Sequence, residues 1–121
     1  MSKVDLELKK AFAELQEKQI ETSQKLRLAD IQIENLKKNK QHAVFTEREI
    51  SALSDSTKTY ESVGRIFMAT PIETVKNNLQ KKQNVAEEKI KVLENNKAYL
   101  ENSLKEATNS LRELVNQKKE S

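Results

Sequence analysis

The sequence has no cysteine, one glycine and one proline among its 121 residues, and only 4% of them are aromatic. Without cysteine the chain forms neither disulfides nor thiolate metal sites, and a single glycine excludes a glycine-rich phosphate-binding loop. The low aromatic content and a mean hydropathy of -0.82 argue against a compact globular core. Because residues that break helices are nearly absent, the composition favours very long helices.

Long apolar runs are also missing. No stretch approaches the ~20 consecutive apolar residues that cross a bilayer, and the opening MSKVDLELKK lacks the apolar core of a signal peptide. We therefore expect a soluble intracellular protein with no membrane partner. The 22 basic and 19 acidic residues are interspersed along the chain, which argues against a nucleic-acid partner.

Apolar residues recur at heptad spacing in two segments, 3–41 and 71–118, each predicted to be one long coiled-coil helix. In the first segment the a positions hold Phe12, Gln19, Leu26 and Ile33, and the d positions hold Leu8, Leu15, Thr22, Ala29 and Leu36. In the second segment the a positions include Ile90, Leu104 and Leu111, and the d positions hold Leu79, Ala86, Leu93, Leu100, Ala107 and Leu114. The fold is thus predicted to be mainly α.

The two helices can pair within the chain, as an antiparallel coiled coil, or each can pair with another chain. One intrachain register places Phe12 opposite Leu114 and sets Lys97, a polar residue at an a position, against the small Ala29. Shifting the register by one step loses burial worth roughly 1.5–3 kcal/mol per large apolar side chain. We therefore predict the first register, with Phe12 in the contact line between the helices.

The segment between the helices, 42–70, carries two signals for helix starts. TEREISAL begins with a capping box formed by Thr46 and Glu49, which predicts a separate short helix. In TPIE, Thr70 is a candidate N-cap and Pro71 suits the first helical position, so the last helix is predicted to begin near Pro71.

Between these signals, 58–69 is rich in residues that favour strands and contains the one glycine, which predicts a β-hairpin turning near Gly64. A lone hairpin is marginal in water, and its edges expose unpaired backbone groups. RIFMA is apolar on both faces, and no other run resembles a strand. We therefore expect several subunits to join their hairpins in a common sheet or closed barrel. The predicted assembly residues are Tyr60, Val63, Gly64, Ile66, Phe67 and Met68.

Four stretches, VDLELKKAFAELQ, KLRLADIQIE, YESVGRIFM and AEEKIKVLENNKAYLENSLKEA, resemble the β-class subunits of prefoldin along the whole chain. The hairpin stretch is the most specific, and a single hairpin matches the β class. The resemblance implies a cytoplasmic, ATP-independent co-chaperone without cofactor or metal. It implies a heterohexamer with two α-class and three further β-class subunits, whose hairpins form a double β-barrel. The coiled-coil tips would hold non-native actin and tubulin and pass them to the cytosolic chaperonin.

Both ends of the chain lie at the tip in this arrangement, and apolar residues gather there. The predicted client-binding residues are Val4, Leu6, Leu8, Phe12, Leu111, Leu114 and Val115. Val4 and Leu6 fall outside the heptad line, so their exposed side chains suit weak, multivalent contacts with unfolded chains. The alternative is that these two residues extend the helix contact or have no role.

No catalytic arrangement is evident, and we predict that the protein is not an enzyme. The one histidine, His42, has no carboxylate cluster beside it, and we interpret it as a solvated residue at a helix end. The basic run at 37–40 is interpreted as cations favoured by a helix C-terminus, with a contact to nucleic acid or to an acidic client tail as the alternative. The alternative function is a coiled-coil scaffold or a zipper-type, transcription-related protein, although no dense basic block adjoins the heptads.

Overall fold

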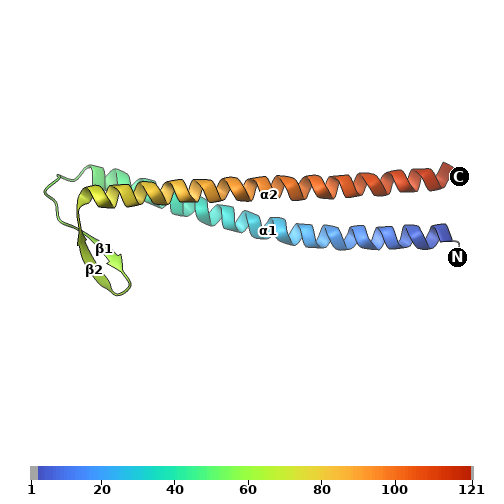
Figure 1. Ribbon diagram of the computed structural model, residues 1–121, viewed down its shortest axis with the longest axis horizontal. Coiled ribbons are helices and arrows are strands. Elements are labelled where there is room, and N and C mark those ends of the chain that lie inside the picture. Colours follow the sequence, from blue (N-terminus) through green and yellow to red (C-terminus); the bar gives the residue numbers. More distant parts are fainter. Residues whose placement is uncertain (1–2, 121) are drawn as a thin grey trace. The chain divides into compact units, whose positions relative to one another are not determined.

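The structure, a computed structural model, describes residues 3–120, with all side chains in that range except those of Val4 and Glu120. The chain forms helix α1 (Lys3–Ser51), strands β1 (Thr59–Val63) and β2 (Ile66–Thr70), and helix α2 (Ile72–Glu120) (Figure 1). The predicted mainly α fold with two long helices and one hairpin is confirmed. The chain divides into two compact units: the terminal unit, which comprises residues up to Ile31 and from Leu93 onward, and the hairpin unit, Gln32–Val92.

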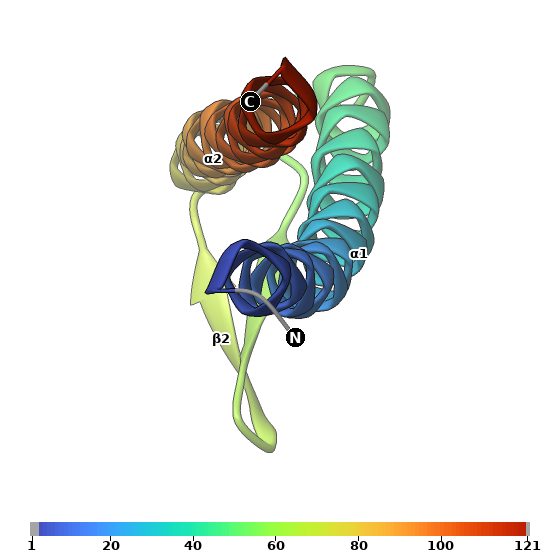
Figure 2. The same ribbon diagram turned by 90° about the vertical axis from the view of Figure 1, so that its right-hand side faces the viewer.

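In the terminal unit the two helices pair in antiparallel orientation. Lys97 Nζ lies 2.5 Å from Asp30 Oδ1, and Lys118 Nζ lies 3.0 Å from Glu7 Oε2, so rising numbers on α2 meet falling numbers on α1. The start of α1 and the end of α2 both lie on the side that faces the viewer in Figure 2. The Lys97 contact falls one residue from the predicted partner, Ala29, and the predicted register is therefore confirmed in this unit.

The heptad d positions are buried or half-buried along both helices, as predicted. The a positions near the N-terminus are not. Phe12 is 54% exposed and Gln19 is exposed, whereas Ala11 and Lys18 are half-buried. A straight helix drifts by about 20° per heptad relative to a 3.5-residue repeat, so over three heptads the contact line moves to the preceding residue. The predicted burial of Phe12 is therefore wrong.

In the hairpin unit, α1 continues without a break through Ser51, so the predicted first helix of 3–41 and the separate short helix from Thr46 are both wrong. The Thr46 hydroxyl donates a hydrogen bond to the His42 carbonyl at 2.8 Å, the bond that a threonine makes inside a helix. The buried Ala43 continues the contact line past residue 41. Since 42–51 contains neither glycine nor proline, nothing in this stretch ends the helix.

The ends of the helices at the hairpin are defined by local hydrogen bonds. After Ser51 the chain tightens, with the Leu53 N–H bonded to the Ile50 carbonyl at 3.0 Å. Helix α2 begins at Ile72, and the Pro71 carbonyl accepts the first helical bond from Val75 N–H at 3.1 Å. The start near Pro71 is thus confirmed. Thr70, the candidate cap, directs its hydroxyl proton to the Met68 carbonyl at 3.0 Å.

The hairpin is an antiparallel pair in which Thr59 faces Thr70 and Val63 faces Ile66. Gly64 has a φ of 63°, and Arg65 has a negative φ. A positive φ at the first central residue alone is typical of the type II′ turn, whose twist matches that of the strands. The predicted turn at Gly64 is confirmed.

We expect Gly64→Ala to weaken the hairpin by about 1–2 kcal/mol, because L-residues are strained at positive φ. A Cβ at Gly64 would meet no atom within 4 Å, so the cost is conformational and not steric. Gly64→Asn is the matched control, since asparagine tolerates positive φ. Amide hydrogen exchange in β1 and β2 measures the effect. Equal protection in the alanine variant and the wild type would contradict this account of the turn.

Candidate assembly and binding surfaces

The hairpin presents apolar side chains on both of its faces. Its pairing puts Val63, Ile66 and Met68 on one face and Tyr60 and Phe67 on the other. All five are more than half exposed, and Phe67 is the most exposed of them at 74%. The predicted assembly residues therefore come together on one small element that covers none of them.

Both outer edges of the hairpin are unpaired among residues 3–120, because the described part of the chain holds one sheet of two strands. Such edges carry backbone N–H and C=O groups that pair readily with another strand. Two unpaired edges and two apolar faces together form a surface that becomes buried only when further chains are added.

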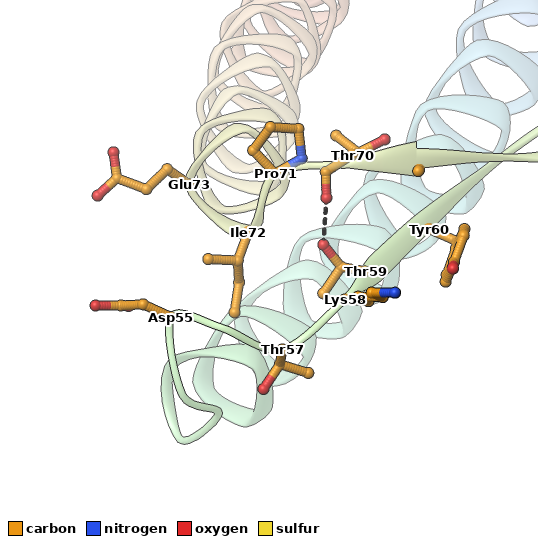
Figure 3. A pocket seen from close by; sticks show the side chains of 10 residues that line it. Asp55, Thr57, Lys58, Thr59, Tyr60, Thr70, Pro71, Ile72 and Glu73 are labelled. Carbon is orange, nitrogen blue, oxygen red and sulfur yellow. Dashed lines mark hydrogen bonds between the residues drawn. The ribbon is translucent and has the colours of Figure 1, made fainter.

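The root of the hairpin is held to the rest of its unit by polar contacts. The Thr59 hydroxyl donates to the Thr70 carbonyl across the strands, beside a hollow of about 710 Å³ (Figure 3). Asn78 Nδ2 of α2 donates to Glu61 Oε1 of β1 at 2.9 Å. The buried Ile72 lines the same hollow. These contacts order the base of the hairpin and leave its apolar part exposed.

At the free end of the terminal unit the predicted client-binding residues fall into three groups. Leu6 and Phe12 are more than half exposed. The half-buried residues are Leu8, Leu114 and Val115. Leu111 is only 8% exposed and belongs to the contact between the helices, whereas the side chain of Val4 lies outside the described residues. The accessible apolar surface at this end thus consists mainly of Leu6 and Phe12.

A groove of about 310 Å³ runs between the helices of the terminal unit next to Phe12 in sequence. Ala11 on α1 and Ala107 on α2 line it, together with Leu15, Leu111 and Leu114. Small residues leave space between paired helices because their side chains do not fill it. Glu14, Lys18 and Ser110 complete the lining. The groove is therefore mainly apolar and of a size suited to single side chains, a feature that heptad spacing did not reveal.

Polar residues of α2 that lie on the contact line reach carboxylates of α1. Gln83 Nε2 donates to Glu47 Oε2 at 2.5 Å in the hairpin unit, as Lys97 does to Asp30 in the terminal unit. The hydrogen bond to Asp30 raises the pKa of Lys97 above its ordinary value, against the lowering effect of partial burial. Lys97 therefore stays charged at neutral pH and marks the register of the terminal unit.

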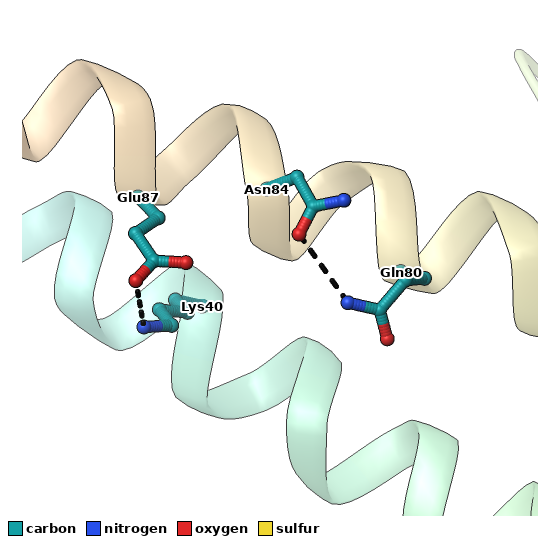
Figure 4. A network of polar contacts seen from close by, with 4 residues as sticks. All are labelled: Lys40, Gln80, Asn84 and Glu87. Carbon is teal, nitrogen blue, oxygen red and sulfur yellow. Dashed lines mark hydrogen bonds and ion pairs between the residues drawn. The ribbon is translucent and has the colours of Figure 1, made fainter.

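The remaining charged residues singled out in the sequence, His42 and the basic run at 37–40, lie in the hairpin unit. Lys40 Nζ lies 3.8 Å from Glu87 Oε1, and Gln80 donates to Asn84 one turn further along α2 (Figure 4). His42 is exposed, but it lies within α1 and not at its end, so that part of its interpretation is wrong. The same holds for the basic run at 37–40. Within residues 3–120 no three His, Cys, Asp or Glu side chains gather as metal ligands.

Among the described residues, neither helix contains an apolar stretch long enough to cross a bilayer.

The model of the prefoldin subunit family matches residues 13–118. "Prefoldin subunit 1" of Pongo abelii is 56% identical over 84 residues, covering 69% of each chain, and the human protein of that name is 55% identical over the same share. "Prefoldin subunit 1" of Arabidopsis thaliana is 32% identical over 64% of this chain and 60% of its own.

Among solved structures, the crystal structure of the prefoldin beta subunit from Thermococcus strain KS-1 superposes with a TM-score of 0.74. The superposition covers 93% of this chain and 96% of the archaeal chain. Because the two sequences are only 23% identical, this match shows a shared fold. The family match over residues 13–118 and the identity to the subunit 1 proteins agree with it, and the chain belongs to the prefoldin subunit family.

Proposed function

We propose that this chain is a β-class subunit of a heterohexameric prefoldin, which it joins through its hairpin. The observation that carries the proposal is the hairpin itself, whose two apolar faces and two unpaired edges are left uncovered by the described residues. Family membership implies assembly with other prefoldin subunits. The resemblance supports two α-class and three further β-class partners, and the comparisons favour this function over a scaffold or zipper.

The proposed activity is ATP-independent binding of non-native proteins, actin and tubulin among them, at the free end of the terminal unit. Leu6 and Phe12 supply exposed apolar surface there, and the nearby groove accepts single apolar side chains. Such contacts are individually weak and gain strength when several subunits engage one client. Transfer of the client to the cytosolic chaperonin, and hence a cytoplasmic location, completes the proposal.

Native mass spectrometry of the tagged chain, purified from its own cells, tests the assembly. We expect a six-subunit complex that contains this chain and five other prefoldin subunits. A homodimer or homotetramer without those subunits would contradict the proposed function.

We expect the double variant Leu6→Asp and Phe12→Asp to weaken client holding by the assembled complex. Light scattering of diluted, denatured actin measures how much complex prevents aggregation, and the variant complex should be needed in roughly twofold to threefold excess, because one of several weak contacts is lost. Leu28→Asp with Ile31→Asp is the matched control, since both residues are more than half exposed on α1 but lie further from the free end. If both variants weakened client holding equally, the free end of the terminal unit would not be the preferred site of client binding.

A further inference from the structure

The positive charge of the chain is concentrated in one of its units. The hairpin unit, 32–92, has eleven basic and eight acidic residues, which leaves +3, the formal charge of the whole chain. The remaining residues carry eleven of each sign. A net charge confined to one unit produces a local potential that an average over the chain conceals.

A groove of about 860 Å³ lies between α1 and α2 in this unit. Its apolar lining includes the buried Ala43 and Ala86 and the half-buried Leu36 and Leu79. Val85 also lines it and is about half exposed. Asn39, His42, Thr46 and Ser62 also line the groove. A hollow of this size that combines apolar surface with polar groups is typical of sites that bind a ligand through both kinds of contact.

Lysines dominate the charge of the groove. Lys81, Lys82 and Lys89 line it and are exposed, and no acidic residue is among its described lining. None of the three forms an ion pair with another residue in the part of the chain that the structure describes. Glu88 precedes Lys89 in the sequence and is exposed, but no ion pair joins it to any of the three lysines among the described residues. Glu87 pairs with Lys40, and Glu47 accepts a hydrogen bond from Gln83.

We propose that this groove docks an acidic peptide segment of a partner protein, with aliphatic side chains on the lining and carboxylates toward the lysines. Charge complementarity identifies the partner, because three uncompensated ammonium groups border an apolar surface. Nucleic acid fits less well, since the described lining holds no arginine and His42 is its one aromatic ring for base stacking. The groove lies in a different unit from the free end and does not rest on client binding there.

Fluorescence anisotropy of a fluorescein-labelled peptide with alternating glutamate and aliphatic residues tests the proposal. The peptide is titrated with the full chain and with the assembled complex. We expect binding by both, weaker binding at higher salt, and no binding of the same peptide with glutamine in place of glutamate.

The double variant Lys82→Glu and Lys89→Glu should weaken peptide binding by roughly tenfold, because it reverses two charges that border the groove. Lys38→Glu with Lys91→Glu is the matched control: both lysines are exposed and neither lines the groove, so a change below about twofold is expected. Val85→Ser should weaken binding by about threefold through lost apolar contact.

Four results would overturn the proposal. Equal weakening by both lysine pairs would show non-specific attraction, and equal binding of the glutamine peptide would show that acidity is not recognised. Tighter binding of a single-stranded RNA oligonucleotide would assign the groove to nucleic acid. Binding by the free chain that disappears in the assembled complex would show that a neighbouring subunit fills the groove. None of these results depends on whether the complex holds clients.

Discussion

Phe67→Asp is expected to yield a helical chain that no longer enters the prefoldin complex. Phe67 is the most exposed of the large apolar side chains of the hairpin, at 74%, so in the free chain an aspartate there meets water. In the proposed barrel the same aspartate would be buried without a partner, at a cost of about 3 kcal/mol, which corresponds to roughly a hundredfold loss in association. Co-expression with the partner subunits followed by native mass spectrometry measures incorporation.

Tyr99→Asp is the matched control for this prediction. Tyr99 is an aromatic residue that is 73% exposed, nearly the same as Phe67, but it lies on α2 and not on the hairpin. We expect this variant to assemble normally and both variants to keep the helical circular dichroism of the wild type. Normal incorporation of the Phe67 variant would show that the hairpin does not join the subunits.

Leu111→Asp is expected to separate the helices of the terminal unit. Leu111 is a buried residue of that unit, and replacing it removes a large apolar contact and places a charge between the helices. The expected loss is about 3–5 kcal/mol. Limited proteolysis and amide hydrogen exchange should show opening of 3–31 and 93–120, while the hairpin unit keeps its protection.

Phe12→Asp is the control for this second prediction. It tests whether stability follows the burial seen in the structure or the positions assigned by the heptad pattern. The heptad assignment treats Phe12 and Leu111 as equivalent a positions, but Phe12 is exposed. We expect its replacement to change stability by less than about 0.5 kcal/mol. If the two variants opened the terminal unit equally, the observed drift of the contact line would be wrong.

Much of the fold follows from local rules that the sequence obeys along its length. The d positions on both helices, the start of α2 beside Pro71 and the turn at Gly64 were all predictable. Each depends on the spacing or conformational preference of a few neighbouring residues. The break expected at Thr46 was wrong because a capping box is also compatible with a helix interior, where the hydroxyl bonds to the preceding turn.

The sequence by itself determined that two long helices form and pair in antiparallel register, and it predicted that the hairpin needs partners, because these features depend on apolar spacing and backbone preference. Only the tertiary structure decided that Phe12 is exposed while Ala11 is covered, since the drift of a contact line depends on how closely the helix keeps 3.6 residues per turn. It also decided that Lys82 and Lys89 border one groove with Leu36 of the other helix. Lys82 and Lys89 share one face of α2 in any helix, but apolar residues of α1 come to lie beside them only when the two helices pair.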